Sequence, residues 1–202
     1  MKILIAIPAM DMCPVPFTYS LATLNRFCPS RISIISGAAV HEARDALARE
    51  AMDDGCDRVL FVDSDMAFES DMMQRLSADM DAGWDMVCGI FTKRRLPVTP
   101  VIYRAIDAQT GEALPYFDYP ENALFEVTAC GFGAVMLSTD LLRRVEAAGN
   151  GLFTPLPKLS EDLSFCVRAR EVGARIACDS TVKVGHVGLM TYGEHLYKRG
   201  VG

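Results

Sequence analysis

The stretch Val59-Leu60-Phe61-Val62-Asp63-Ser64-Asp65-Met66 points to the fold and to a site at the same time. Its four leading apolar residues are typical of a buried β-strand, and two carboxylates follow with one residue between them. In an open α/β sheet, ligands bind outside the carboxyl ends of the strands, where this pair would lie. Two carboxylates there can hold a hard divalent cation that bridges the oxygens of a diphosphate. On these residues alone, a solvated acidic turn that caps the next helix is an equally open interpretation.

Similar apolar runs recur on both sides of this strand, separated by helical patterns. The runs span residues 3–7, 32–35, 59–62 and 86–88. Apolar residues at helical spacing occupy 41–54 and 70–82, and each pattern is followed by a glycine that can end a helix, Gly55 or Gly83. This alternation predicts an α/β fold with a mainly parallel central sheet flanked by helices.

The second half of the chain is less regular. Prolines interrupt short β-prone pieces at positions 97, 100, 115 and 120, and Thr110-Gly111 predicts the turn of a hairpin. A strand-like stretch over 125–137 follows. Two helices are then expected over 139–148, with Thr139 as N-cap, and over 161–172, with Ser160 as N-cap and Gly173 after the end. A last strand is expected over 175–178.

Composition limits the classes of protein to consider. The 202 residues are 50% hydrophobic and 23% charged, which predicts one globular domain over 1–202. The net charge of −6 argues against stable binding of nucleic acid or of an anionic membrane. No apolar run approaches the roughly 18 residues of a spanning helix, and the first run stops at Pro8 without a cleavage site. Seven cysteines without a Cys-x-x-Cys pair predict reduced, mostly buried thiols and a cytoplasmic location.

Two further features could carry chemistry. Ser160-Glu161-Asp162 opens a predicted helix, although acidic residues in a first helical turn are favoured by the helix dipole whatever the function. His186 follows the last predicted strand, between Gly185 and Gly188. A lone histidine is more often packed or exposed than a ligand. Imidazole together with carboxylates nevertheless suits manganese, and the glycines permit close backbone approach.

Taken together, these features resemble the metal-dependent glycosyltransferases of the GT-A fold, most closely the family 2-like members. The resemblance covers most of the chain, and the order and spacing of its pieces are more specific than any one piece. The matching pieces are the strand ending at Pro8, the helix with Ala43-Arg44-Asp45-Ala46-Leu47-Ala48, the Asp-x-Asp motif at 60–66, the stretch Ala129-Cys130-Gly131-Phe132-Gly133-Ala134-Val135-Met136-Leu137, the segment 161–173 and Val184-Gly185-His186. The resemblance implies a nucleotide-sugar-binding half over 1–90 and an acceptor-side half over 91–202.

The resemblance also implies roles for individual residues. Asp65 would be the direct ligand of Mn²⁺ or Mg²⁺, Asp63 would contact the cation's water shell or the ribose, and His186 would be the third metal ligand. Asp162 matches the catalytic base of inverting members, and Glu161 its neighbour that positions the acceptor. Further donor-site residues are expected at Pro8, Ala9 and Ser64, and acceptor-site residues at Gly131, Phe132 and Gly133.

The basic residues leave two interpretations open. Lys93-Arg94-Arg95 follows the predicted strand at 86–88, on the sheet edge expected for Asp65. It is either a solvated loop or a site for the phosphates of the donor or of a phosphorylated acceptor. Lys93 and Arg94 are therefore predicted to bind the nucleotide sugar. Arg44 is a weaker prediction of the same kind, because an arginine on a helix is usually just exposed.

The implied function is transfer of a sugar from a nucleoside-diphosphate sugar to an acceptor hydroxyl, with inversion. A bound cation would stabilise the charge that develops on the leaving diphosphate, and a carboxylate would take the proton of the hydroxyl. The acceptor is expected to be a glycan, a lipid-linked sugar or a protein. Because little sequence follows His186, a second copy of the chain is a possible source of further acceptor-side residues.

Three alternatives compete with this function. Haloacid dehalogenase-like phosphatases also use Asp-x-Asp, but on the first strand and with Thr or Val where this chain has Ala67. Sugar nucleotidyltransferases need a glycine-rich loop after the first strand, and Pro8-Ala9-Met10-Asp11 lacks one. A protein of the same fold that binds a nucleotide sugar or a glycan without turnover stays open, although the acidic positions and His186 are all present.

Overall fold

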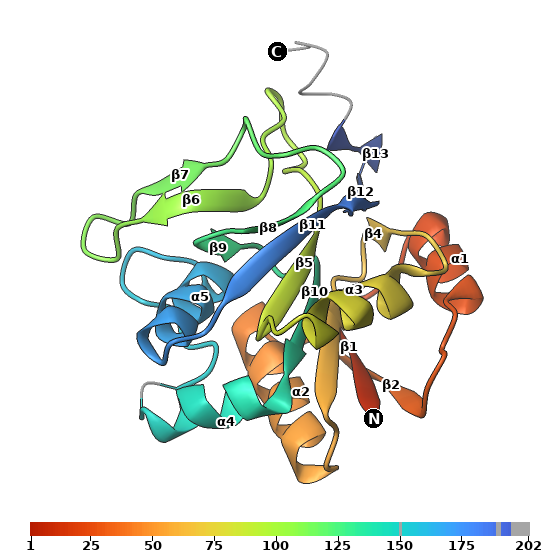
Figure 1. Ribbon diagram of the computed structural model, residues 1–202. Coiled ribbons are helices and arrows are strands. Elements are labelled where there is room, and N and C mark those ends of the chain that lie inside the picture. The colour runs from red at the N-terminus through yellow and green to blue at the C-terminus, as the bar shows by residue number, and fades with distance from the viewer. Residues whose placement is uncertain (150, 189–190, 195–202) are drawn as a thin grey trace.

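The computed structural model describes residues 1–149, 151–188 and 191–194, and Figure 1 shows their arrangement. A seven-stranded sheet forms its centre, and five of the strands run in one direction while β10 and β8 run in the other. In spatial order the strands are β2 (Ser30–Ser36), β1 (Ile3–Ala9), β3 (Arg58–Val62), β10 (Ala134–Ser138), β5 (Met86–Ile90), β11 (Ile176–Lys183) and β8 (Leu124–Glu126). The expected mainly parallel α/β sheet is confirmed.

Helices cover both faces of this sheet, which is why its central strands are buried along their whole length. The helices are α1 (Val15–Thr23), α2 (Val40–Asp53), α3 (Met72–Asp81), α4 (Thr139–Ala147) and α5 (Glu161–Glu171). Helix α2 packs on β1 and contacts α4, which in turn contacts α5, whereas α3 packs on β10, β5 and β11. Among the described residues, no helix has both the length and the apolarity needed to cross a bilayer.

Two small sheets stand at the end of the central sheet where β3 and β5 finish (Figure 1). The first joins β4 (Met66–Ala67), β12 (Gly185–Val187) and β13 (Thr191–Tyr192). The second joins β7 (Ala113–Pro115), β6 (Ile102–Ile106) and β9 (Ala129–Cys130), with the predicted turn at Thr110-Gly111 between β6 and β7. The first small sheet matters for the site, because it brings the segment after Asp65 beside the segment that carries His186.

Two expectations about local structure were wrong, and one helix was not expected. The single strand expected over 125–137 is three short strands, β8, β9 and β10, because the chain leaves one sheet and enters another around Gly131 and Gly133. The N-cap of α4 is Ser138, whose hydroxyl accepts from the backbone N–H of Leu141 at 3.1 Å, and not Thr139. Helix α1 was not expected at all, since only Phe17 and Ser20 of its residues are buried and no clear apolar face marks it.

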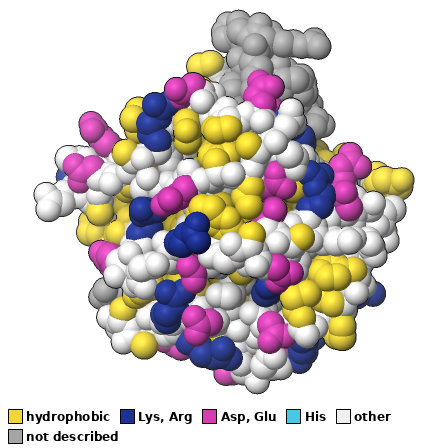
Figure 2. All heavy atoms as spheres, in the orientation of Figure 1, with side chains coloured by type: hydrophobic (Ala, Val, Ile, Leu, Met, Phe, Trp, Pro, Cys, Tyr) yellow, Lys and Arg dark blue, Asp and Glu magenta, His cyan; other side chains and the backbone are white. Residues whose placement is uncertain are grey.

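The seven cysteines all have free thiols, and five of them are buried. The charged residues are mixed by sign on the face seen in Figure 2, where acidic and basic side chains of the described residues alternate instead of gathering into one basic field.

A carboxyl on α3 provides a prediction about stability and pH. Asp79 lies beside Asp179 of β11, and partial burial together with that second carboxylate raises the pKa of Asp79 to about 6. A group whose folded pKa lies above its unfolded pKa stabilises the fold fully only below the unfolded pKa, near pH 4, and this contribution is lost as the pH rises through about 6.

Asp79→Asn is therefore expected to raise the free energy of unfolding at pH 7 by roughly 1 kcal/mol, a value discounted because solvent reaches part of this carboxyl. The gain should vanish at pH 4. Urea denaturation of both proteins between pH 4 and pH 7 measures it, and an identical pH dependence in the two proteins would contradict the assignment.

Candidate functional site

The loop Asp63-Ser64-Asp65 follows the end of β3 and is held in place by backbone hydrogen bonds. The N–H of Asp63 donates to the carbonyl of Gly133 at 3.1 Å, and the N–H of Met66 donates to the carbonyl of Asp63 at 3.1 Å. The carbonyl of Asp65 accepts from the N–H of Val187 at 2.8 Å. The two carboxylates are therefore presented by a fixed turn at the carboxyl end of the strand, as expected.

The pairing of β4 with β12 brings Asp65 and His186 together. Residue His186 lies opposite Met66 in this ladder, and its Nε2 lies 3.4 Å from Oδ2 of Asp65. The other ring nitrogen, Nδ1, lies 2.9 Å from the carbonyl oxygen of Thr92. Because a carbonyl only accepts, Nδ1 carries the proton of this contact, and Nε2 is the ring nitrogen that faces Asp65.

Asp65 is ionised more readily than an isolated aspartate. Burial disfavours its charged form, but the contact with His186 and the positive charge of Arg94 outweigh burial, so the pKa of Asp65 lies below its ordinary value. Nη1 of Arg94 lies 2.9 Å from the same Oδ2. Arg94 thus lies at the same sheet edge as Asp65, where the sequence predicted its basic cluster.

Arg44 connects the two acidic segments of the site. Its side chain is 3% exposed, its Nη2 lies 2.7 Å from Oδ1 of Asp63, and its Nη1 pairs with Oε1 of Glu161. The guanidinium also lies over the ring of Phe132, 5.3 Å from the ring centre. Burial disfavours the charge of Arg44, but the two carboxylates more than compensate and raise its pKa. Arg44 therefore neutralises Asp63 and Glu161. These two ion pairs would have to break before its guanidinium could bind a phosphate.

Burial is also the largest influence on the pKa of each of the two partners of Arg44. It raises the pKa of Asp63 and of Glu161 above their ordinary values, and Arg44 offsets only part of the shift in each case. Because Arg44 is almost fully buried between these two carboxylates, the ion pairs hold the end of β3, the helix α2 and the start of α5 in one arrangement.

A cavity of 240 Å³ lies between these acidic segments. Asp162 faces it from the first turn of α5, and His186 and Lys93 line it from other sides. The Ser160 hydroxyl and the Leu163 N–H, the latter at 2.8 Å, both donate to Oδ1 of Asp162. This arrangement leaves Oδ2 as the oxygen of Asp162 that is turned toward Gly131 and the cavity.

The two glycines expected on the acceptor side, Gly131 and Gly133, lie where neighbouring side chains leave no room for a Cβ. A Cβ on Gly131 would lie 2.5 Å from Val101 and 3.4 Å from Oδ2 of Asp162, and a Cβ on Gly133 would lie 2.4 Å from Met66. Phe132 between them is 1% exposed and packs among other phenylalanines. Gly131 and Gly133 therefore keep the cavity open, and Phe132 forms its floor.

A second hollow of 150 Å³ adjoins the same loop at the ends of β1 and β3. Pro8 and Ala9 line it together with the whole turn Asp63-Ser64-Asp65, so five residues predicted from the sequence to bind the donor meet here. Asp63 is the residue that both hollows share.

The site also contains residues that the sequence did not indicate. Thr92 holds the ring of His186 through its carbonyl, and the ring of Phe91 packs edge-on against His186 with ring centres 6.1 Å apart. Nothing in the sequence singles out Thr92, because it acts through a backbone atom that every residue has.

The site fits a cation held jointly by protein and ligand. Among the described residues, no three His, Cys, Asp or Glu side chains converge on one point, and Asp63 is turned toward Arg44. Asp65 and His186 do converge, at a separation close to the roughly 3 Å between neighbouring ligands of an octahedral ion. Mg²⁺ and similar ions often take one or two protein ligands and fill the remainder with phosphate oxygens and water.

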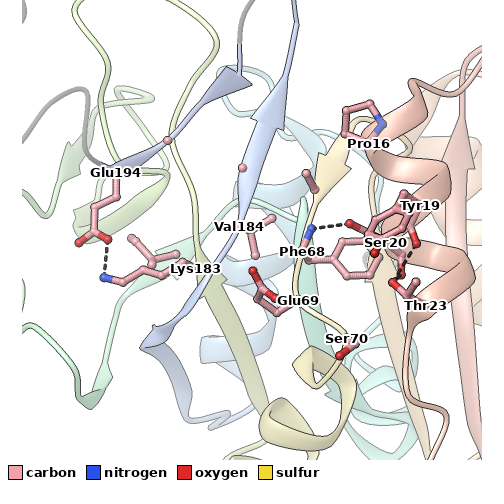
Figure 3. Close-up of a pocket in the computed structure, with 14 residues that line it drawn as sticks. Pro16, Tyr19, Ser20, Thr23, Phe68, Glu69, Ser70, Lys183, Val184 and Glu194 are labelled. Atoms are coloured by element: carbon pink, nitrogen blue, oxygen red, sulfur yellow. Dashed lines mark hydrogen bonds and ion pairs between the residues drawn. The ribbon is translucent and has the colours of Figure 1, made fainter.

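A larger cavity, 640 Å³, lies elsewhere. Figure 3 shows it between α1 side chains such as Tyr19 and Thr23 and the ion pair of Lys183 with Glu194. Ala67 and Gly185 line this cavity, whereas their neighbours Met66 and His186 line the 240 Å³ cavity. Successive residues of a strand face opposite sides, so β4 and β12 separate the two cavities, and Asp63, Asp162 and His186 lie around the smaller one.

Comparison with known proteins shows the fold. No family model matches the chain, and no curated protein matches it in sequence. Among solved structures, A197 from STIV is similar with a TM-score of 0.69 at 21% identity, over 93% of this chain and 86% of that one. TarS 1–349 of S. aureus in complex with UDP-GlcNAc is similar with a TM-score of 0.58 at 18% identity, over 97% of this chain and 60% of that one. A second TarS 1–349 structure gives 0.52 at 15% identity, over 88% and 58%.

At these identities the likeness concerns the fold alone. The chain has a GT-A-like fold, the fold of the glycosyltransferase TarS, as the sequence resemblance predicted.

Proposed function

We propose that this chain is a metal-dependent glycosyltransferase that moves a sugar from a nucleoside-diphosphate sugar to an acceptor hydroxyl with inversion. One observation supports this function most strongly. His186 and the carboxylate of Asp162 line the same 240 Å³ cavity, and Asp65, 3.4 Å from His186, lines the hollow beside it. The TarS neighbour contains UDP-GlcNAc, which makes a nucleoside-diphosphate sugar the natural class of donor to test.

In this proposal, the nucleoside of the donor lies against Pro8 and Ala9, and its diphosphate lies toward Asp65. Asp65 and Nε2 of His186 would hold Mn²⁺ or Mg²⁺, with the ring of His186 oriented by the carbonyl of Thr92. The cation would supply positive charge to the leaving diphosphate. Lys93 lines the cavity and adds a cationic group on the same side as the acceptor.

Asp162 is assigned as the base. An acceptor hydroxyl is a poor nucleophile, and a carboxylate within hydrogen-bond reach removes its proton as the new bond forms. Oδ1 of Asp162 is occupied by two donors of its own chain, so Oδ2 is the oxygen that would take the proton. Glu161, tied to Arg44, orients the first turn of α5 and so the base beside it. A glycan, a lipid-linked sugar or a protein is the expected acceptor.

Nucleotide binding provides the direct test of this function. The thermal midpoint is measured with UDP, GDP, ADP and CDP, each with and without Mn²⁺. A ligand at a hundred times its dissociation constant stabilises by about 2.7 kcal/mol, which raises the midpoint of a chain of this length by roughly 5–10 °C. We expect such a rise with one nucleotide in the presence of Mn²⁺ and its loss in Asp65→Ala.

If none of the four nucleotides changes the thermal midpoint, with or without Mn²⁺, the prediction is contradicted. A midpoint that rises without any turnover of the matching nucleotide sugar, not even slow hydrolysis, would instead support the binding protein without activity.

A further inference from the structure

Arg94 forms an ion pair with Asp65, the carboxylate that would bind the proposed cation. Its Nη1 lies 2.9 Å from Oδ2 of Asp65 and 3.2 Å from the carbonyl oxygen of Val187, to which it donates. The same Oδ2 lies 3.4 Å from Nε2 of His186. The guanidinium therefore neutralises the oxygen of Asp65 that faces the second proposed ligand, and a divalent ion cannot bind there while this ion pair persists.

The surroundings of Arg94 differ from those of a structural arginine. Its side chain is 47% exposed, on the loop after Phe91, and one carboxylate pairs with it. Arg44, by contrast, is 3% exposed and joins two carboxylates. Solvent reaches the arginine side of the Arg94–Asp65 pair, and one carboxylate is involved, so Arg94 leaves Asp65 at a lower cost than buried Arg44 would leave its two carboxylates.

We propose that Arg94 is an exchangeable counter-ion: it neutralises Asp65 in the free protein and transfers to the diphosphate of the donor when a divalent cation takes its place. This inference rests on the proposed function and adds an order of events to it. A cation that binds alone must displace Arg94 and leave the guanidinium without a partner. A diphosphate provides that partner, because guanidinium groups bind phosphate oxygens strongly.

Cation and diphosphate therefore bind cooperatively, and part of the coupling passes through Arg94. Since coupling between two ligands is reciprocal, the diphosphate tightens cation binding by the same factor as the cation tightens diphosphate binding. The free protein consequently holds the cation weakly and acquires it together with its donor.

The experiment measures Mn²⁺ binding by electron paramagnetic resonance, without nucleotide and with UDP, GDP, ADP or CDP. The expected result is that Arg94→Ala binds Mn²⁺ alone about 3- to 10-fold more tightly than the unchanged protein, the factor set by a weak ion pair. The enhancement of Mn²⁺ binding by the nucleotide should fall by a similar factor. Because Arg94 is largely exposed, the variant should fold with an unchanged circular dichroism spectrum.

Arg95→Ala is the matched control. Arg95 carries the same charge on the same loop, and among the described residues it has no carboxylate partner, so its removal tests whether a general change of charge would suffice. Its Mn²⁺ affinity should stay within about twofold of the unchanged protein. Equal or weaker Mn²⁺ binding by Arg94→Ala, or equal tightening by both variants, would overturn the exchange.

Asp65→Ala separates this inference from the proposed function. If Asp65→Ala abolishes Mn²⁺ binding while Arg94→Ala leaves it unchanged, the exchange fails and the cation site stands. If Mn²⁺ binding is absent from the unchanged protein with every nucleotide, or persists unaltered in Asp65→Ala, the cation site itself fails, and the exchange fails with it.

Discussion

Asp162→Asn is expected to lower the rate of sugar transfer by about 10²- to 10⁴-fold while donor affinity changes little. The substitution keeps the size and shape of the side chain. Its carbonyl oxygen can still accept from the Ser160 hydroxyl and the Leu163 N–H, so the first turn of α5 should keep its structure. The amide group that replaces Oδ2 cannot take a proton from an acceptor hydroxyl, and the loss should therefore fall on the chemical step.

Two measurements separate these effects. Initial rates of donor turnover report the chemistry, and calorimetric titration of the nucleotide with Mn²⁺ reports donor binding. Asp140→Asn is a suitable control, because Asp140 also lies in the first turn of a helix but is 77% exposed on α4, away from the cavity. Equal losses of rate and of donor affinity in Asp162→Asn would show that Asp162 positions the donor and is not the base.

The second large effect concerns stability. Arg44→Met is expected to lower the free energy of unfolding by about 3–5 kcal/mol, because it leaves Asp63 and Glu161 without the charge that neutralises them. Methionine fills much of the same volume, so packing against Phe132 should be affected less than the charges. The fold should tolerate the removal of Arg44 poorly, although the arginine touches neither sugar nor cation in the proposed function.

Urea denaturation measures this loss, with Arg49→Met as the control. Arg49 lies on the same helix and pairs with Glu146, but its side chain is 50% exposed, so its removal should cost at most about 1 kcal/mol. Adding Glu161→Gln to Arg44→Met removes one of the two uncompensated charges and should recover part of the stability. A cost for Arg44→Met no larger than that for Arg49→Met would show that solvent, and not Arg44, neutralises the carboxylates.

Much of the fold was predictable from local patterns. The runs before Pro8 and Asp63 are strands, and the helical patterns ending before Gly55 and Gly83 are helices whose ends differ from those expected by one or two residues. The strands are buried on both faces and appear in the sequence as continuous apolar runs. The helices are buried on one face and appear as apolar residues at helical spacing. Helix α1 leaves no such period, and it was missed for that reason.

The segment from 125 to 137 shows where local pattern misleads. Its apolar residues are buried as expected, but they belong to strands of two different sheets. Gly131 and Gly133 lie where the chain changes sheets, and neither has room for a Cβ, a requirement visible only when Val101 and Met66 are seen packed against them.

Residues close together in the chain suffice to predict the α/β class, the acidic turn after β3 and the helix start that carries Asp162, because each of these is a local feature. Which charges neutralise one another depends on how the chain folds. Arg44, expected to contact phosphate, joins Asp63 to Glu161, and Arg94 and His186 share one oxygen of Asp65. Such pairings depend on distances between segments far apart in the chain, and residue type alone does not encode those distances.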